Sequence, residues 1–384
     1  MTAQVDPVII IGGGQSGLAA ARAALDTGLR PVVLHAGAEP VGSWPDYYDS
    51  LTLFSPAGYS ALPSMPFDGD PDRYPHRDEV TAYLRRYADA LAVDIRTRTR
   101  AIAVHARAGG GYLVRTDAGD ELPAAGVVAT GSFGNPYLPT LPGQSEYGGD
   151  LRHVADYHCP DAYDGKRIVV VGAGNSAVQV AYELAPSAYV TLAAREPIRF
   201  LPQRIRGQDL HHWLRVTGGD RLPRAIITRL VRHATVLDTG RYRDAITSGR
   251  LPRRDMFTAF TPDGVLWRDG TVEQVDAVIF ATGYRPDLDY LAPLATVDRG
   301  VPQQVDGIST THPGLVYLGL EFQRSFASNT LRGVGRDAAH VMAALAAHAD
   351  RRPRFFRQVR PTAPGAQRST SPLHVDGATD GAGG

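Results

Sequence analysis

The sequence predicts an α/β fold made of two similar units, with the second unit inserted into the first. One observation is the order strand, glycine-rich turn, helix and strand at the start of the chain, from residue 8 to residue 34. Another is the return of that order in mid-chain, from residue 167 to residue 192. A third is a pair of apolar runs that both end in Thr-Gly, at residues 127–131 and 278–283, on either side of the mid-chain unit.

The first unit opens with a β-branched run at residues 8–11 that leads into glycines. Such a run is typical of a buried parallel strand. An alanine-rich stretch at 18–25 predicts a helix that Gly28 ends, and residues 31–34 predict the next strand. These elements make a β–α–β unit.

The second unit repeats this pattern with a strand at 167–171, a helix at 177–184 and a strand at 189–192. Because the Thr-Gly strands flank it, we expect nesting. The first domain would comprise residues 1–154 and 284–360, with its last helix at 337–347. The second would comprise 155–283, with an excursion at 205–260 that is a candidate lid. The tail at 361–384 is rich in Gly, Pro, Ser and Thr and predicts disorder.

Composition excludes several classes of protein. The 384 residues carry 40 Lys and Arg against 40 Asp and Glu, so there is no basic footprint for nucleic acid or an anionic membrane. Cys159 is the only cysteine, which excludes an internal disulfide and a Cys-x-x-Cys redox pair and fits a cytoplasmic protein. No apolar run approaches the roughly 18–20 residues of a membrane helix, and the N-terminus does not resemble a signal peptide. The oligomeric state stays open, with a homodimer among the alternatives.

Two glycine motifs predict nucleotide binding. Residues 12–17 read G-x-G-x-x-G between a strand and a helix, and residues 172–177 repeat the motif with alanine last. The first glycine permits a tight turn, the second lets the backbone approach a pyrophosphate, and the third lets helix and strand pack closely. The helix N-terminus then offers unpaired N–H groups to the anion. The candidate cofactor contacts in the motifs are Gly12, Gly14, Gln15, Ser16 and Gly17, then Gly172, Gly174, Asn175, Ser176 and Ala177.

The residue at the end of the second strand of each unit helps to determine which nucleotide binds. It falls 18 positions after the last motif residue in both units. In the second unit it is Arg195, which suits the 2′-phosphate of NADPH, and Arg199 or Arg204 could share that role. In the first unit it is His35, which can make one bond to an adenosine ribose where a carboxylate would accept two. Glu39 is close enough to substitute, and we assign FAD to this unit.

The linker before the second unit supports these assignments through a family resemblance. Class B flavoprotein monooxygenases, which include flavin-containing and Baeyer–Villiger monooxygenases, share the signature F-x-G-x-x-x-H-x-x-x-W/Y. Residues 147–157 resemble it, with matches at Gly149, His153 and Tyr157 and tyrosine in place of the phenylalanine. The sequence at 281–287 and the two nested Rossmann-like units also resemble this family, over roughly residues 5–350. The stretches 42–44 and 320–337 are similar to its short bacterial members.

The resemblance implies a reaction. NADPH would reduce FAD, and the reduced flavin would add dioxygen to form a flavin hydroperoxide that oxygenates a nitrogen or sulfur atom of a small molecule. His153 would act at the hinge between the domains and couple NADP⁺ binding to domain position. The flavin carries the chemistry, which agrees with a chain that shows no obvious acid–base constellation.

Further residues are candidate flavin or substrate contacts. Trp44 follows a Gly-Ser turn, and Ser55 stands where longer family members often carry an asparagine. A polar loop follows residues 316–319. The remaining candidates are Gln323, Arg324, Asn329 and Leu331, together with the Thr-Gly turns Thr130, Gly131, Thr282 and Gly283.

Other functions stay open at the level of sequence. Baeyer–Villiger oxygenation of a ketone is the first alternative, although the linker ends at Tyr157 instead of tryptophan, with no Asp or Pro directly after it. A reductase or oxidase without oxygen transfer, and a redox-sensing binding protein, are the others.

Overall fold

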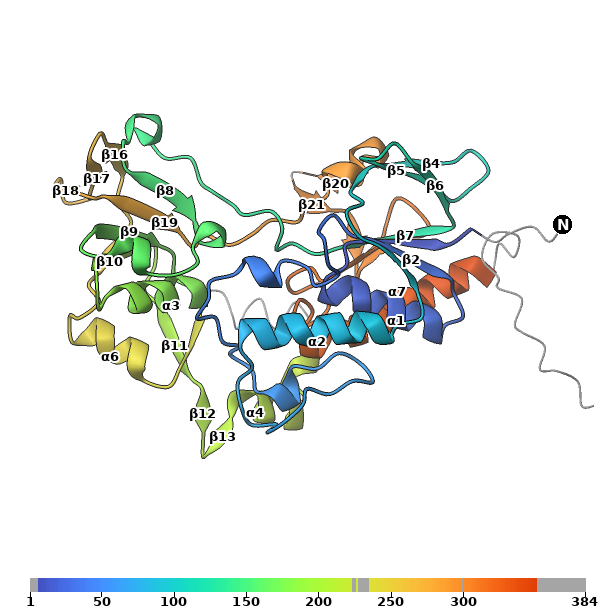
Figure 1. Ribbon diagram of the computed structural model, residues 1–384, viewed down its shortest axis with the longest axis horizontal. Helices are drawn as coiled ribbons and strands as arrows, with labels where there is room; N and C mark the ends of the chain where they lie inside the picture. The colour runs from blue at the N-terminus through green and yellow to red at the C-terminus, as the bar shows by residue number, and fades with distance from the viewer. Residues whose placement is uncertain (1–5, 223–225, 227–234, 299, 351–384) are drawn as a thin grey trace, which may run out of the picture.

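Two lobes, each built around a parallel sheet, make up the computed structural model (Figure 1). It describes residues 6–222, 226, 235–298 and 300–350, so the predicted tail at 361–384 lies outside the described residues. In this described part of the chain, none of the helices is long and apolar enough to cross a membrane.

The first lobe contains a seven-stranded sheet with the order β22-β23-β24-β7-β1-β2-β3. The five strands from β24 to β3 are parallel, and β22 and β23 add an antiparallel edge. The strand bounds are β1 Val8–Ile11, β2 Pro31–Leu34, β3 Asp94–Arg96, β7 Gly126–Thr130, β22 Gln304–Val305, β23 Ile308–Ser309 and β24 Leu315–Leu318. The sheet therefore joins strands from both ends of the chain.

The second lobe contains a five-stranded parallel sheet with the order β15-β10-β9-β19-β8. The strand bounds are β8 Asp150–His153, β9 Arg167–Val171, β10 Tyr189–Ala194, β15 Arg253–Asp255 and β19 Ala277–Phe280. All of its strands come from the middle of the chain.

Each parallel sheet is covered by helices on one face and by a three-stranded antiparallel sheet on the other. In the first lobe these are α1 (Gln15–Asp26), α2 (Arg77–Ala90) and α7 (Leu331–Asp350) opposite β4 (Ala101–Ala106), β5 (Tyr112–Thr116) and β6 (Glu121–Ala124). In the second they are α3 (Asn175–Leu184) and α6 (Arg241–Thr247) opposite β16 (Ala259–Thr261), β17 (Gly264–Leu266) and β18 (Val272–Gln274).

The double burial explains why these strands have uninterrupted apolar sequences. Along β1, Ile10 packs in the core under the helices, whereas Ile9 and Ile11 pack in the core under the antiparallel sheet. Successive side chains of a strand point to opposite faces, so both faces need apolar residues when both are covered.

The predicted strands of both β–α–β units are confirmed, and the helix bounds need correction. α1 begins at Gln15 instead of residue 18, and α7 begins at Leu331 instead of residue 337. The first residues of α1, Gln15 and Ser16, are polar and line a cavity that the two lobes share, so apolar periodicity gives no signal there. The first turns of α7 contain Gly333 and Gly335, which have low helix propensity.

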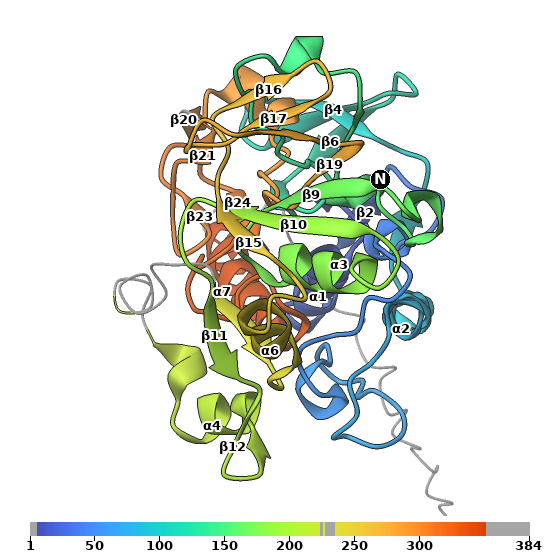
Figure 2. The ribbon, with the colours of Figure 1, turned by 90° about the vertical axis from the view of Figure 1, so that its left-hand side faces the viewer.

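Residues 205–260 leave the second sheet only in part. β15 within this range pairs with β10, and β14 (Thr235–Asp238) pairs with β11 (Arg199–Pro202). What projects from the lobe is residues 203–221, which we call the arm (Figure 2). It contains β12 (Arg204–Ile205), β13 (Gln208–Asp209) and α4 (Leu210–Val216). The arm contacts the first lobe through hydrogen bonds from Gln203 to Phe54 and from Tyr74 to Asp209.

Candidate functional site

A cavity of about 930 Å³ lies where the two lobes meet. The first lobe contributes its glycine loop, Gly12–Ser16, to the lining. The second lobe contributes Asn175, Ser176 and Gln179 from the start of α3. One cavity therefore touches the helix N-termini of both glycine motifs.

The glycines of the first motif are required by the packing of strand against helix. A Cβ atom on Gly17 would lie 1.8 Å from the backbone oxygen of Gly12, and Gly12 itself has a φ of +106°. Gly14 caps α1 without any side-chain hydrogen bond, so the first N–H groups of α1 are left for a ligand. Gln15 and Ser16 line the cavity beside this end, as do Thr130 and Gly131 of the neighbouring strand end.

In the second motif, one glycine packs closely against the backbone and another leaves space in front of it. A Cβ atom on Gly172 would lie 2.5 Å from the backbone oxygen of Ala281, whereas one on Gly174 would meet no heavy atom within 4 Å. Ala177 is fully buried in the core under α3. The space in front of Gly174 is therefore open, as the approach of a pyrophosphate to the backbone requires.

His35 lines the cavity and is fixed by the first glycine loop. The backbone N–H of Gly13 donates to Nδ1 of His35 at 3.2 Å. Burial lowers the pKa of His35, so the ring is neutral at pH 7 and carries its proton on Nε2. A hydrogen bond between the ring and the backbone of Glu39 opposes this shift. Glu39, the other candidate, instead forms an ion pair with Arg85 of α2, and both are half exposed.

Three predicted site residues are joined by hydrogen bonds. The indole Nε1 of Trp44 donates to Oε1 of Gln15 at 3.2 Å, and Nε2 of Gln15 donates to the backbone oxygen of Asn329 at 2.8 Å. All three line the cavity, together with Leu331 at the start of α7. The helix dipole end, the Trp44 turn and the loop before α7 are thus held in one arrangement.

Ser55 also lines the cavity, and its Oγ lies 2.7 Å from Oγ of Ser60. Its hydroxyl is therefore engaged within the loop that it belongs to.

His153 is fully buried at the end of β8, outside the lining of the cavity. Its Nδ1 accepts from the backbone N–H of Ala155 at 3.1 Å, so Nε2 carries the proton and donates to the backbone oxygen of Gly283 at 3.0 Å. Burial lowers the pKa of His153, against the opposing effect of the bond to Gly283. The ring is a neutral connector between two chain segments.

Several predicted residues lie away from the cavity lining. Gln323 is buried, with its amide used by Tyr317 and Leu320 of its own lobe, and Arg324 pairs with Asp337. Arg195 is exposed directly after β10. The hydroxyl of Thr282 donates to the backbone oxygen of Tyr137.

The cavity residues that sequence reasoning missed include Tyr48, Gln179 and Tyr284. Tyr48 donates from its hydroxyl to Oε1 of Gln179, and this bond joins the two lobes across 131 positions of sequence. Burial raises the pKa of Tyr284 to about 12, so its phenol stays protonated. Tyr284 could have been found because it directly follows the second Thr-Gly turn.

Comparisons with known proteins decide the family. The profile of the pyridine nucleotide-disulphide oxidoreductase family matches residues 9–319. The indole-3-pyruvate monooxygenase YUCCA1 of Oryza sativa subsp. japonica is 32% identical, over 74% of this chain and 78% of its own. A flavin-containing monooxygenase from Stenotrophomonas maltophilia superposes with a TM-score of 0.78 at 32% identity, covering 90% of this chain and 99% of that one. The chain belongs to the pyridine nucleotide-disulphide oxidoreductase family and, within it, to the flavoprotein monooxygenases.

An uncharacterized CzcO-like oxidoreductase of Geobacillus kaustophilus (strain HTA426) is 29% identical over 87% of this chain and 97% of its own. The resemblance to class B flavoprotein monooxygenases is confirmed, and FAD and NADPH are the cofactors of this flavoprotein monooxygenase. The motifs that predicted two nucleotides sit at the cavity just described.

Proposed function

We propose that this monooxygenase uses NADPH and dioxygen to oxygenate a nitrogen or sulfur atom of a small molecule. The observation that carries the proposal is the single cavity onto which both glycine motifs open. Two nucleotides with their pyrophosphates at the N-termini of α1 and α3 would bring their redox-active rings into the same space. That arrangement suits transfer of a hydride from one to the other.

The first lobe is proposed to bind FAD and the second NADPH. The division we propose assigns residues 6–149 and 284–350 to the FAD domain and 150–283 to the inserted NADPH domain. We propose this boundary before β8, where the sequence suggested residue 154, because β8 pairs with β19 of the second sheet.

The protein's own part in the reaction is to hold and enclose the cofactors. The N-terminus of α1 and the neutral His35 are proposed to bind the pyrophosphate and adenosine ribose of FAD, while Trp44, Gln15 and Asn329 fix the wall of the cavity. FAD, when bound and reduced by NADPH, supplies activated oxygen to the substrate. Wall residues that are already hydrogen-bonded to each other need no rearrangement when a ligand enters.

Arg195 is proposed to recognise the 2′-phosphate of NADPH. It follows β10, the strand next to the one that leads into the second glycine motif, and its side chain is exposed. The test compares KM for NADPH and NADH in wild type and Arg195→Ala. We expect KM for NADPH to rise about tenfold or more with little change for NADH; an unchanged ratio removes Arg195 from recognition.

The reaction itself is tested by product analysis under ¹⁸O₂. The holoenzyme is incubated with NADPH and a tertiary amine, a thioether or a cyclic ketone, and the masses of the products are measured by mass spectrometry. One ¹⁸O atom in an N-oxide or sulfoxide supports the proposal. An ester from the ketone alone would assign Baeyer–Villiger oxygenation instead, and NADPH oxidation that yields only hydrogen peroxide with every substrate would overturn oxygen transfer.

A further inference from the structure

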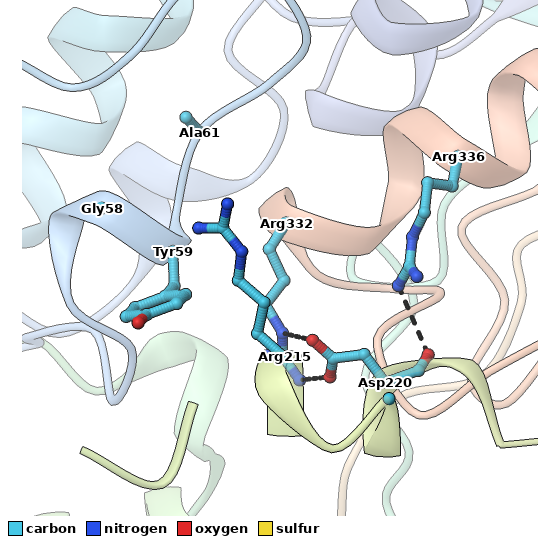
Figure 3. A pocket seen from close by; sticks show the side chains of 8 residues that line it. Gly58, Tyr59, Ala61, Arg215, Asp220, Arg332 and Arg336 are labelled. Carbon is cyan, nitrogen blue, oxygen red and sulfur yellow. Dashed lines mark hydrogen bonds and ion pairs between the residues drawn. The ribbon is translucent and has the colours of Figure 1, made fainter. Parts of the chain in front are cut away.

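A second, smaller cavity of about 270 Å³ lies between the arm and the first lobe (Figure 3). Its walls come from three separate segments of the chain. They are the loop around Gly58, Tyr59 and Ala61, the arm residues Arg215, Gly218 and Asp220, and Arg332 and Arg336 of α7. None of these residues lines the cofactor cavity. We call this the arginine pocket.

Three guanidinium groups share the arginine pocket with one carboxylate. Arg332 and Arg336 are four residues apart, so they project from the same side of α7. Asp220 accepts from Nε of Arg332 at 3.3 Å and from Nη2 at 2.7 Å, which neutralises that one arginine. Among the described residues, Arg336 donates a hydrogen bond only to the backbone oxygen of Asp220, at 3.3 Å. The formal charge of the lining is therefore positive.

Donor capacity in the pocket exceeds the acceptors that the described residues provide. The side chain of Arg332 is 7% exposed, and its Nη1 is buried without a hydrogen-bond partner among the described residues. Arg215 extends from α4 toward Tyr59 and Ala61, with its guanidinium carbon 6.0 Å from the Tyr59 ring and no carboxylate of the described residues within reach (Figure 3). Unmet donors and excess positive charge in one concave site favour an anion, since a buried donor without a hydrogen-bond partner is destabilising.

The position of the pocket gives such an anion a structural effect. Arg215 and Asp220 belong to the arm, which is part of the second lobe's sequence, whereas Arg332 and Arg336 belong to the first lobe. The arginine pocket is adjacent to the cofactor cavity, because Arg332 lines the pocket and the preceding residue, Leu331, lines the cavity. An anion between the arginines would add a bridge between the arm and α7.

We propose that the arginine pocket binds the carboxylate or phosphate group of a small anionic ligand, and that this anion fastens the arm to α7. The site is separate from the cofactors and does not depend on which atom the enzyme oxygenates. The shared chemistry is a compact oxyanion that accepts bidentate hydrogen bonds from guanidinium groups.

The test is calorimetric titration of the holoenzyme, whose bound FAD fills one nucleotide phosphate site, in saturating NADP⁺, which fills the other. Inorganic phosphate and phenylacetate are the two probes, at constant ionic strength. We expect at least one to bind with one-to-one stoichiometry, and its affinity to fall tenfold or more in Arg215→Gln. Arg268→Gln, an exposed arginine of the loop between β17 and β18, is the matched control and should bind as wild type does.

Arg215→Gln is chosen because removal of Arg332 would leave Asp220 buried without its partner. Arg336→Gln is the second variant and should also weaken binding, with flavin absorbance confirming that the holoenzyme is intact. Binding of phosphate alone or phenylacetate alone identifies the class of ligand, and either supports the proposal. If neither probe saturates, or if both Arg215→Gln and Arg336→Gln bind as tightly as wild type, the proposal is wrong.

Discussion

Nε2 of His153 donates a hydrogen bond to the backbone oxygen of Gly283 at 3.0 Å, which joins the two places where the chain passes between the lobes. His153 ends β8, just after the chain enters the second lobe, and Gly283 follows β19, just before the chain returns (Figure 1). The paired strands β8 and β19 thus end in a side-chain bond at the hinge. We propose that this bond helps to set the distance between the two nucleotide ends of the cavity.

We predict that His153→Ala loosens the hinge and uncouples the enzyme. The fraction of NADPH that yields oxygenated product should fall several-fold, while hydrogen peroxide rises, because the lobes no longer hold a water-free cavity. Product and peroxide are measured together against NADPH consumed. His105→Ala, at an exposed histidine of β4, is the control and should leave coupling unchanged. Equal coupling in both variants would show that the hinge bond has no part in turnover.

We predict that stability falls as the pH drops below about 6.5. Burial lowers the pKa of His153 from its ordinary value of 6.5, so the unfolded chain binds this proton more readily than the folded protein. The free energy of unfolding then decreases as pH falls through 6.5 toward the lower folded pKa. Urea unfolding between pH 8 and pH 5.5 should show a shallower decline in His153→Gln, and an unaltered decline in His105→Gln. Parallel curves for wild type and His153→Gln would contradict this.

The sequence predicted the parts of the site that backbone geometry dictates locally. Gly17 and Gly172 were found because only glycine fits where a Cβ atom would strike the backbone 1.8 Å or 2.5 Å away. The bond between Tyr48 and Gln179 spans 131 positions and leaves no local pattern to detect.

Long-range pairing also explains the candidates that lie elsewhere. Glu39 is near His35 in sequence, but its carboxylate forms an ion pair with Arg85 of α2. Gln323 follows a buried strand as a flavin contact would, yet its amide is used by the backbone of Tyr317 and Leu320. A polar residue's partner depends on the fold, which residue type alone does not reveal.

We predict that Gly174→Ala separates NADPH binding from FAD binding. A Cβ atom there meets nothing within 4 Å, so the variant should fold and retain FAD, yet it would occupy the space through which the pyrophosphate approaches. KM for NADPH should rise about tenfold or more. Gly17→Ala is the contrasting variant, because its Cβ would collide with Gly12, and it should lose FAD. An unchanged KM in Gly174→Ala would place the pyrophosphate elsewhere.

We predict that Gln15→Leu weakens FAD binding. The amide of Gln15 bonds to Trp44 and to Asn329, and each neutral hydrogen bond contributes about 0.5–1.5 kcal/mol, so affinity should fall roughly fivefold to a hundredfold. Reconstitution of the apoprotein, followed by flavin fluorescence, measures the change. Gln208→Leu, at an exposed glutamine of the arm, should bind FAD as wild type does. Equal affinity in the two variants would contradict the prediction.

The arm is held on the first lobe by Asp209, and we predict that Asp209→Asn destabilises the protein. Its carboxylate accepts from the hydroxyl of Tyr74 at 2.6 Å, from Nε2 of Gln203 at 2.7 Å and from both the backbone N–H and Nδ1 of His211 at 2.8 and 2.7 Å. Burial opposes ionisation, but these bonds outweigh it and lower the pKa of Asp209 to about 2. Asparagine cannot accept all four, so the free energy of unfolding at pH 7 should fall by about 2–4 kcal/mol.

The same pKa shift fixes how that loss depends on pH. Because the folded pKa is lower than the ordinary value of 3.8, Asp209 contributes its full stabilisation above pH 3.8 and loses it as pH falls toward 2. The difference between wild type and Asp209→Asn should therefore shrink below pH 3.8. Asp26→Asn is the control, since the carboxylate of Asp26 is 53% exposed in its pair with Arg22 and should contribute less than about 1 kcal/mol. Urea unfolding of wild type, Asp209→Asn and Asp26→Asn measures these differences. If Asp209→Asn loses no more free energy of unfolding than Asp26→Asn does, the arm is held by other contacts.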